Sequence, residues 1–556
     1  MKKVLVLAPP PTPNGDLHVG HLSGPYLRAD IYSRYSRMLG NETYYLCGID
    51  EHQSYVALKG RQVGLGPQET ADRFAAEIEQ TLSAAHIQMD LIARPSRLPQ
   101  HRPMVEKVFY QLQRESRIVE REAPCLFCDA CRMYLYEAYV RGLCPHCDQP
   151  SGGNSCEACG RPNDCRDLRD PVCNICGTRA GVRNVARFCL PLSAYEKQLQ
   201  EYFDTATMSS NIRALGEQMI KDGLPEIAIT HPASWGLSAP GVSGQRIYVW
   251  FEMAMGLLAS TQALSEAIDE PGGWERFWKS TDVEIVKFLG FDNTFFYSLF
   301  FSAIFQAWDP EIRLPQALLA NEFYRLEGQK FSTSRNHAIW GRELLRDQNA
   351  DLVRFYLAYN GPETEQTSFT LAEYEQTVGR ELLDGVQGWL RQLGSAVSDE
   401  YSGIAPSPGV WTGTMHRFYG RLNDIVGKAA AGYSTKEFST QRVARLLLEL
   451  AREARFFSHS ESHWKRVPNR RLTRNTAISL ELLAAKTLAL LAAPIMPGFA
   501  ARLWHDLGQT KPLQVQSWPH DLEWIRPGTV LSNLRRNYFD QYEDVKSLSR
   551  PAAAYV

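Results

Sequence analysis

The stretch "KKVLVLAPPPTPNGDLHVGHLSG" at residues 2–24 contains a short apolar run, a turn-rich loop and the start of a helical pattern. Residues 2–8 predict a buried strand and residues 9–16 a loop. Residues 18–40 have helical periodicity that ends at Gly40, and residues 42–50 predict a second strand. Strand, helix and strand at this spacing indicate a βαβ unit of a parallel sheet.

The same alternation continues on both sides of a cysteine-rich interruption. A helix is expected near residues 66–86, and residues 119–190 break the pattern with Cys, Gly and Pro. The α/β pattern resumes at residues 246–255 and 284–292. From about residue 365 long amphipathic stretches predict a helical bundle.

Composition is that of a globular protein. The 556 residues allow two to four domains, and 44% hydrophobic with 22% charged residues fit a soluble chain. We find no apolar run of the roughly 18 residues that a membrane span needs. Residues 482–501 contain Lys486 and two prolines, which favours a bundle-core helix. The N-terminus has no small-residue cleavage site. We therefore expect a cytoplasmic protein that has no membrane partner.

Clustered cysteines predict a metal-binding module. Of the 12 cysteines, 11 fall between residues 125 and 189, and no secretory signal accompanies them. A C-x-x-C turn directs two thiolates at one point, and two such turns complete a tetrahedral zinc site. The pairs predicted to bind metal are Cys125/Cys128, Cys144/Cys147, Cys156/Cys159 and Cys173/Cys176.

Nesting of these pairs predicts two zinc sites. Cys144/Cys147 and Cys156/Cys159 would form one site, and Cys125/Cys128 and Cys173/Cys176 the other. Four protein ligands leave no open position, so both sites would be structural. Cys131, Cys165 and Cys189 are then surplus, and Cys47 is interpreted as a core residue.

Two short motifs predict a phosphate site. In "HVGH", His18 and His21 flank Gly20 at the start of a helix, where N–H groups and the helix dipole attract phosphate. Two ordinary core or surface histidines remain the alternative for this motif alone. In "EGQKFSTSRN" (327–336), Lys330 precedes hydroxyls on a loop of a kind that can close over a phosphate chain.

"HVGH" together with "KFSTS" resembles the paired signatures of class I aminoacyl-tRNA synthetases, usually H-I-G-H and K-M-S-K-S. The chain is most similar to the methionyl-tRNA synthetase family, and the resemblance covers nearly its whole length. Four C-x-x-C pairs resemble the members of that family that bind two zinc ions. The other matching stretches are "YLCGIDEHQ", "ITHPASWG", "YVWFEMAMG" and "FLGFDNTFFYSLF".

This resemblance implies an α/β fold: a Rossmann (HUP-type) catalytic domain with a zinc-knuckle insertion, followed by an all-α bundle of the anticodon-binding type. The implied boundaries are residues 1–118 and 191–325 for the catalytic domain and 119–190 for the insertion. Residues 326–375 would form the KMSKS-like loop and stem-contact region, and 376–556 the bundle.

The implied chemistry is formation of an aminoacyl-adenylate from ATP and an amino acid, with Mg²⁺. His18, His21 and Lys330 would be catalytic, and Asp50 would hold the substrate's ammonium group. The implied ATP-binding residues are Asn14, His18, Gly20, His21, Gly290, Asp292, Lys330, Ser332 and Ser334. The implied amino-acid-binding positions are Pro10, Thr12, Asp50, Trp250, Ala254, Leu257 and Tyr297.

Several of these positions depart from the family pattern. Pro10 and Thr12 replace leucine and tyrosine, Ala254 and Leu257 replace proline and tyrosine, and Tyr297 replaces histidine. A pocket that exchanges contacts this widely is expected to change substrate, because single contacts supply about 1–3 kcal/mol of discrimination. The alternative is drift within a true methionine enzyme.

The positions that carry cations near the phosphates in this family, and the positions that read the anticodon, depart from the family pattern as well. His231, Phe291 and Thr333 stand where the family has arginine, lysine and lysine. The family's anticodon readers correspond to Gln387 and Arg391, with Trp464 offset by one residue. The loss of amide and stacking contacts argues against reading of a specific anticodon.

These departures favour a specialised ligase. The leading hypothesis is transfer of the activated amino acid to a non-standard acceptor, a small-molecule amine or hydroxylamine as in hydrazine- or ester-forming pathways, with a separate cupin-type partner. The alternatives are an authentic methionine–tRNA ligase with tRNA as acceptor, and a catalytically silent RNA-binding or regulatory paralogue. The retained histidines, Asp50, Asp292 and Lys330 argue against a silent paralogue.

Overall fold

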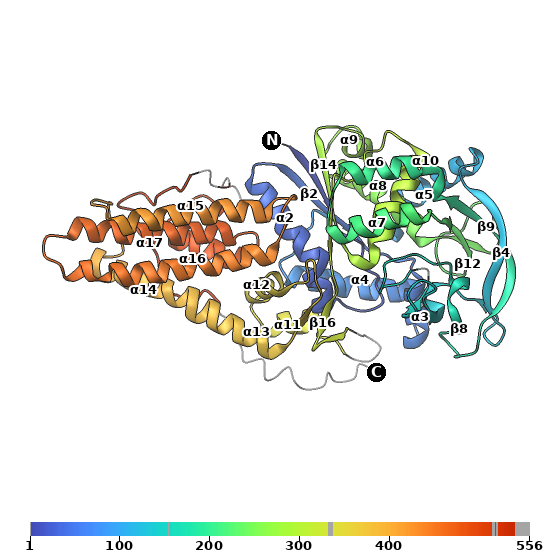
Figure 1. Cartoon of the computed structure of the whole chain (residues 1–556), viewed down its shortest axis with the longest axis horizontal. Coiled ribbons are helices and arrows are strands. Elements are labelled where there is room, and N and C mark those ends of the chain that lie inside the picture. Colours follow the sequence, from blue (N-terminus) through green and yellow to red (C-terminus); the bar gives the residue numbers. More distant parts are fainter. Residues whose placement is uncertain (1, 154, 332–336, 514–517, 519–520, 540–556) are drawn as a thin grey trace.

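The computed structural model describes residues 2–153, 155–331, 337–513, 518 and 521–539. An α/β domain lies at the centre, with the cysteine-rich insertion at one end of the molecule and a helical bundle extending from the other (Figure 1). This arrangement confirms the predicted fold class.

A six-stranded parallel sheet in the order β10-β15-β14-β1-β2-β3 forms the core of the α/β domain. Successive residues of β1 face opposite sides, so Val4 and Val6 join one core and Leu5 and Leu7 the other. Burial on both faces explains the nearly continuous apolar run of β1. The strands are β1 (Lys3–Leu7), β2 (Glu42–Gly48), β3 (Leu91–Ala93), β10 (Thr207–Met208), β14 (Val283–Gly290) and β15 (Ala317–Asn321).

Helices cover both faces of this sheet. The stretch that resumes the α/β pattern begins as β13 (Gln245–Ile247) and continues as the long helix α8. The helices are α1 (Val19–His21), α2 (Leu27–Met38), α3 (Ser54–Val63), α4 (Pro67–Ala84), α5 (His101–Arg114), α6 (Glu196–Thr205), α7 (Ser210–Asp222), α8 (Val249–Ala267), α9 (Gly273–Trp278), α10 (Phe301–Trp308), α11 (Gly341–Asp347) and α12 (Ala350–Asn360).

The insertion is built from short antiparallel strands. Its long pair, β4 and β9, joins β5 and β11 in one sheet, and β6, β7 and β8 form a smaller one. The strands are β4 (Val119–Cys128), β5 (Met133–Tyr134), β6 (Val140–Leu143), β7 (Pro150–Gly152), β8 (Arg169–Cys173), β9 (Gly181–Pro191), β11 (Glu226–Ala228) and, after it, β12 (Thr230–Pro232).

A three-stranded sheet leads from the α/β domain to the bundle. It consists of β16 (Tyr324–Leu326), β17 (Gln329–Lys330) and β18 (Thr367–Phe369). The helices that follow are α13 (Leu371–Thr377), α14 (Gly388–Tyr401), α15 (Gly413–Tyr433), α16 (Thr440–Glu461), α17 (Arg471–Ala492) and α18 (Pro497–Asp506). Among the described residues, α17 has the length and apolarity of a membrane span, but 94% of its apolar window is buried inside the protein.

One buried arginine ties the bundle to the sheet. Arg354 on α12 is 1% exposed and donates to the Asp30 carboxylate on α2 at 2.6 Å. Its other N–H groups donate to the carbonyls of Ala85 at 3.0 Å, Ile495 at 2.7 Å and Pro494 at 2.9 Å. These carbonyls belong to the end of α4 and the turn before α18, so a single guanidinium links three segments.

Replacing Arg354 with methionine is therefore expected to destabilise the whole chain. The change leaves a buried carboxylate and three buried carbonyls without this donor, so the free energy of unfolding should fall by about 3–5 kcal/mol. The midpoint of urea unfolding measures the loss. Arg102→Met, which breaks the exposed pair with Glu106, is the control and should shift stability by less than about 0.5 kcal/mol. Equal shifts in the two variants would contradict this role of Arg354.

Candidate active site and zinc sites

A cleft of about 400 Å³ opens at the carboxyl ends of the parallel strands. The crevice lies where β1 and β14 are neighbours and the chain leaves them toward opposite sides of the sheet, the usual ligand position in such sheets. Its lining includes most of the predicted residues: Pro10, Thr12, Asn14, His18, Gly20, His21, Asp50, Trp250, Gly290, Asp292, Tyr297 and Lys330.

The two signature motifs meet in this cleft. The rings of His18 and His21 stack with their centroids 3.7 Å apart, and Phe331 of "KFSTS" stacks on the other face of His18 at 4.4 Å. Gly20 is needed because a Cβ there would lie 3.0 Å from the His18 ring and 3.1 Å from Phe331. The sequence did not reveal this stack, which joins residues more than 300 positions apart.

Backbone contacts set the tautomer of both histidines. The N–H of His21 donates to Nδ1 of His18, and the N–H of His18 donates to Nδ1 of His21, each at 3.3 Å. A ring that accepts at Nδ1 carries its proton at Nε2. Desolvation by the surrounding protein lowers the pKa of His18 well below its usual value. It also lowers the pKa of His21 to about 4, although part of the His21 side chain remains exposed to the cleft. Both rings are therefore neutral Nε2–H donors at pH 7, suited to phosphate oxygens.

Asp50 also lines the cleft. Its side chain is 6% exposed, and burial raises its pKa well above the usual value. A substrate ammonium placed beside it would restore the ionised form. The geometry fits the expected role in holding the α-ammonium group.

Behind Asp50 lies an ion cluster that sequence reasoning missed. The carboxylate of Glu252 on α8 lies 2.6 Å from Nδ1 of His52 and 2.9 Å from Nε2 of His101. Burial alone would raise the pKa of Glu252, but the two imidazoles lower it to about 2, and the carboxylate in turn raises the pKa of His52. A signal was present in "DEHQ", where His52 stands two residues after Asp50.

Gly290 and Asp292 lie at the end of β14. A Cβ on Gly290 would fall 2.7 Å from Oδ1 of Asp292, so glycine is required for the carboxylate to fold back against the strand. Burial raises the pKa of Asp292 to about 6. Above that pH the carboxylate can accept hydrogen bonds from ribose hydroxyls, as the resemblance implies.

Aromatic packing closes one end of the cleft. Trp250 stacks on Phe296 with centroids 3.7 Å apart, and the Tyr297 hydroxyl donates to the sulfur of Met253 at 3.3 Å. Leu257 lines a cavity of about 40 Å³ that adjoins the cleft and shares Pro10, Asp50 and Met253 with it. Ala254 is fully buried in the same helix. The roles of these two residues in binding the amino acid stay predictions.

Lys330 lies at the cleft and forms an ion pair with Glu157 of the insertion. Ser332, Thr333 and Ser334, the other predicted members of this loop, lie outside the described residues. His231 does not line the cleft. It stacks on Tyr136 with centroids 5.7 Å apart and lines a small cavity within the insertion.

Two groups of four cysteines fit tetrahedral zinc. Cys144, Cys147, Cys156 and Cys159 form the predicted inner site, with sulfur distances of 3.7 Å and 3.9 Å. In the second group the distances are 3.5 Å and 3.9 Å. Zinc–sulfur bonds of about 2.3 Å place tetrahedral sulfurs about 3.8 Å apart, so both groups have the right size.

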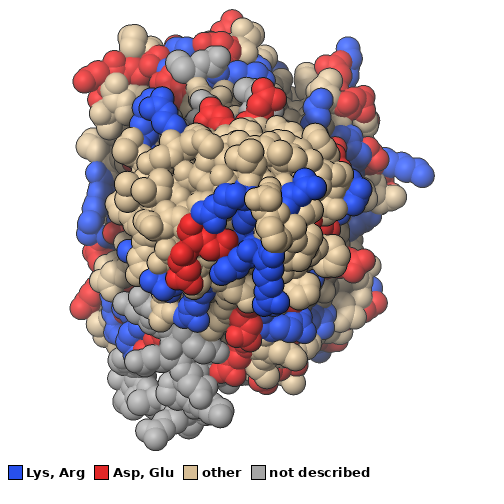
Figure 2. All heavy atoms as spheres, turned by 90° about the vertical axis from the view of Figure 1, so that its left-hand side faces the viewer, with Lys and Arg blue, Asp and Glu red and all other residues tan. Residues whose placement is uncertain are grey.

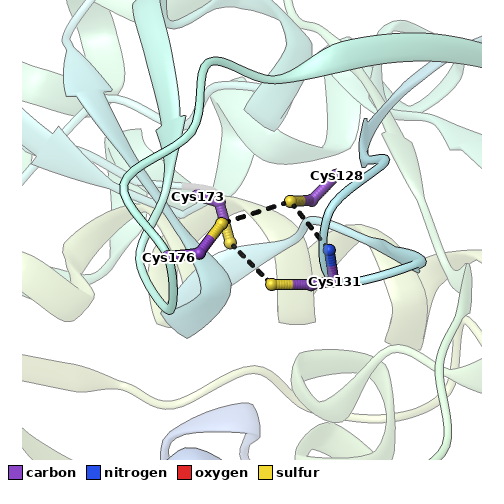
Figure 3. Close-up of side chains that lie close together, drawn as sticks. All are labelled: Cys128, Cys131, Cys173 and Cys176. Atoms are coloured by element: carbon purple, nitrogen blue, oxygen red, sulfur yellow. Dashed lines mark hydrogen bonds between the residues drawn. The ribbon is translucent and has the colours of Figure 1, made fainter.

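The second group corrects one predicted ligand. It consists of Cys128, Cys131, Cys173 and Cys176, and Figure 3 shows their sulfurs converging. Cys125 lies instead on β4 and lines the small cavity with His231. Strand residues three apart point to opposite faces, so Cys125 and Cys128 cannot share a metal. Cys131 follows the end of the strand, in the turn before β5, where a knuckle can form.

The predicted anticodon readers are engaged within the chain. The Gln387 side-chain carbonyl accepts from the backbone N–H of Tyr538 at 2.6 Å, and Arg391 donates to the Asn537 side chain. Trp464 is half-buried, and its indole N–H donates to the Glu461 carboxylate at 2.7 Å. Residues 537 and 538 therefore contact the helix face that carries the predicted anticodon readers Gln387 and Arg391.

Comparison with known proteins identifies the family. Residues 4–392 match the family model described as tRNA synthetases class I (M). The chain belongs to the methionyl-tRNA synthetase family. It is accordingly a class I aminoacyl-tRNA synthetase-type ligase, as the paired motifs indicated.

Relatives of this synthetase match it along most of its length. A methionine–tRNA ligase of Pyrobaculum islandicum is 30% identical over 522 residues, 93% of this chain and 90% of the relative. One from Chlorobaculum tepidum is 30% identical over 524 residues, 91% and 73% of the two chains. A methionyl-tRNA synthetase structure from Mycobacterium tuberculosis, solved with methionyl-adenylate, superposes with a TM-score of 0.80 at 18% identity, covering 97% of this chain and 100% of that one.

Zinc content tests the corrected ligand set of this synthetase. Cys131→Ser removes a ligand from one of the two groups, so bound zinc should fall from two ions per chain to one. Cys125→Ser, which changes a nearby cysteine on β4, is the matched control and should keep both ions. Metal analysis of the purified variants measures the difference. Loss of zinc in Cys125→Ser, with full zinc in Cys131→Ser, would restore the original pairing.

The raised pKa of Asp292 predicts a pH dependence for ATP binding. As pH falls through about 6 the carboxyl is protonated and becomes a weaker acceptor for the ribose hydroxyls, so the KM for ATP should rise. Asp292→Asn should bind ATP weakly at every pH and remove this step.

The same substitution should raise stability. A carboxyl whose folded pKa lies above its unfolded value stabilises the fold at low pH and loses that contribution as pH rises from about 4 to 6. The asparagine variant avoids this penalty, and its thermal midpoint at pH 7.5 should rise by about 1–3 °C. A lower midpoint together with unchanged ATP binding would contradict both statements.

Proposed function

We propose that this synthetase activates an amino acid with ATP and transfers the aminoacyl group to tRNA, with methionine as the amino acid. The paired motifs support activation, because the stacked His18, His21 and Phe331 place two neutral donors beside Lys330 at the same cleft wall. The names of the relatives support methionine and tRNA, since these relatives cover more than 90% of the chain, bundle included.

In the proposed reaction, an oxygen of the amino-acid carboxylate attacks the α-phosphorus of ATP, and the bond from that phosphorus to pyrophosphate breaks. The Nε2–H groups of His18 and His21 donate to phosphate oxygens where negative charge develops. Asp50 fixes the ammonium group and Asp292 the ribose, so the reacting atoms are held in line. Mg²⁺ would enter with ATP and neutralise the pyrophosphate. Zinc would hold the two knuckles and take no part in the chemistry.

The far end of the bundle offers a surface for nucleic acid. Figure 2 views this end, where Lys and Arg side chains, with acidic groups beside them, cross a largely uncharged surface. Lys465, Arg466 and Arg470 between α16 and α17, and Arg471 at the start of α17, are exposed. Cations of this kind contact the phosphate backbone of RNA.

A small-molecule amine or hydroxylamine is the second candidate acceptor. It is favoured by the engagement of Gln387 and Arg391 with Asn537 and Tyr538, which occupies the predicted anticodon readers. The comparisons favour tRNA over this acceptor and do not support a separate cupin-type partner. We place the enzyme in the cytoplasm, where tRNA charging takes place.

ATP–pyrophosphate exchange with a full panel of amino acids tests the proposal, followed by acceptor assays with and without tRNA. Methionine-dependent exchange and charging of tRNA are expected. Exchange with an amino acid whose transfer requires an amine or hydroxylamine would support the second candidate. No exchange with any amino acid would refute ligase activity and favour the silent paralogue.

His21→Ala tests the phosphate site within the same assay. Loss of a preorganised donor should lower exchange by about 10²-fold or more, while zinc content stays unchanged. Exchange at the wild-type rate would show that His21 does not contact the phosphates.

A further inference from the structure

The turn between Cys156 and Cys159, a knuckle of the inner four-cysteine group, reaches the mouth of the cleft. Glu157, between the predicted zinc ligands Cys156 and Cys159, lines the cleft and forms an ion pair with Lys330. Gly160 follows with a φ of +71°, and a Cβ there would lie 3.2 Å from the Phe291 ring, which also lines the cleft. The knuckle therefore touches the cleft both beside Asp292 and at the phosphate loop.

The rest of the α/β domain anchors this knuckle. Arg161 donates to the Asp222 carboxylate at the end of α7 at 2.6 Å, and Gly160 packs closely against Leu215 of the same helix. On the other side, a zinc ion held by the four sulfurs of the inner group would fix the turn that presents Glu157. The carboxylate is thus held at the cleft by two independent restraints and does not depend on a long flexible loop.

A carboxylate in this position should oppose ATP binding, because it repels the triphosphate and competes with it for Lys330. The ion pair is partly exposed, with 59% of the Lys330 side chain and 54% of the Glu157 side chain accessible. Exposed pairs shift a binding constant by about two- to fivefold. A contact of that strength can be exchanged by ATP, whereas a buried pair would block the site.

We propose that Glu157 is a positioning residue that holds Lys330 away from the phosphates in the empty enzyme and takes its ammonium back as pyrophosphate leaves. This inference rests on the proposed function, in which the cleft binds ATP and releases pyrophosphate. It assigns the zinc knuckle a task in the reaction cycle: to present an anion that competes with the departing product.

Glu157→Gln tests the proposal. Affinity for a non-hydrolysable ATP analogue, measured by calorimetry, should increase by about two- to fivefold, and pyrophosphate should inhibit exchange at correspondingly lower concentration. The conservative Glu157→Asp should stay within twofold of the wild type. Asp170→Asn, which removes the acid of the exposed Arg179–Asp170 pair in the same insertion, is the matched control and should change neither value.

A double variant shows whether Glu157 acts through Lys330. In a Lys330→Met background, Glu157→Gln should raise the affinity for the analogue clearly less than it does beside Lys330, because only the direct repulsion of the triphosphate is then removed. Weaker binding by Glu157→Gln, an equal gain in the Lys330→Met background, or loss of zinc from Glu157→Gln would each overturn the proposal. Analogue binding needs no amino acid, so a failure of exchange would refute the proposed function and leave this test intact.

Discussion

The buried pair between Arg354 and Asp30 is the interaction on which the arrangement of the domains depends. Asp30 lies on α2, the helix that continues the chain beyond "HVGH", and Arg354 lies on α12, which leads to the bundle. The neighbouring Asp351 accepts from the backbone N–H of Phe499 at 2.6 Å and so caps α18. A charged pair is costly to desolvate, and it is retained here with four backbone carbonyls accepting from the Arg354 guanidinium. The position of the bundle is therefore coupled to the helix that carries the phosphate motif.

The histidines of the cleft hold the charge state that adenylation needs before substrate arrives, whereas the ionisation of Asp50 depends on the substrate. Both histidines are neutral donors, since desolvation disfavours their cationic forms. Asp50 and Asp292 have raised pKa values that a bound ammonium group or the hydroxyls of ribose would lower. The binding of substrate and the ionisation of its partners are thus linked, and each ligand completes the electrostatics of its own subsite.

Local patterns predicted much of the fold. Periodicity identified β1 and the following βαβ unit because a strand buried on both faces must be apolar throughout, and the motifs placed His18, Gly20, Asp50 and Asp292 at one cleft. Local patterns do not tell which way a helical residue faces. Ala254 and Leu257 lie about one and two helical turns beyond Trp250, and Leu257 lines the cavity beside the cleft whereas Ala254 is buried, because facing depends on how α8 packs against the sheet.

The sequence by itself determined the family, the two motifs and the presence of two four-cysteine groups, since these follow from residue types at short fixed spacings. Tertiary structure decided which cysteines share a metal. "CLFCDAC" offers two overlapping C-x-x-C pairs, and only the end of β4 at Cys128 selects the pair with Cys131. It also decided that Phe331 stacks on His18 and that Glu157 meets Lys330. Contacts between segments more than 100 residues apart depend on how separate elements pack, which no local spacing encodes.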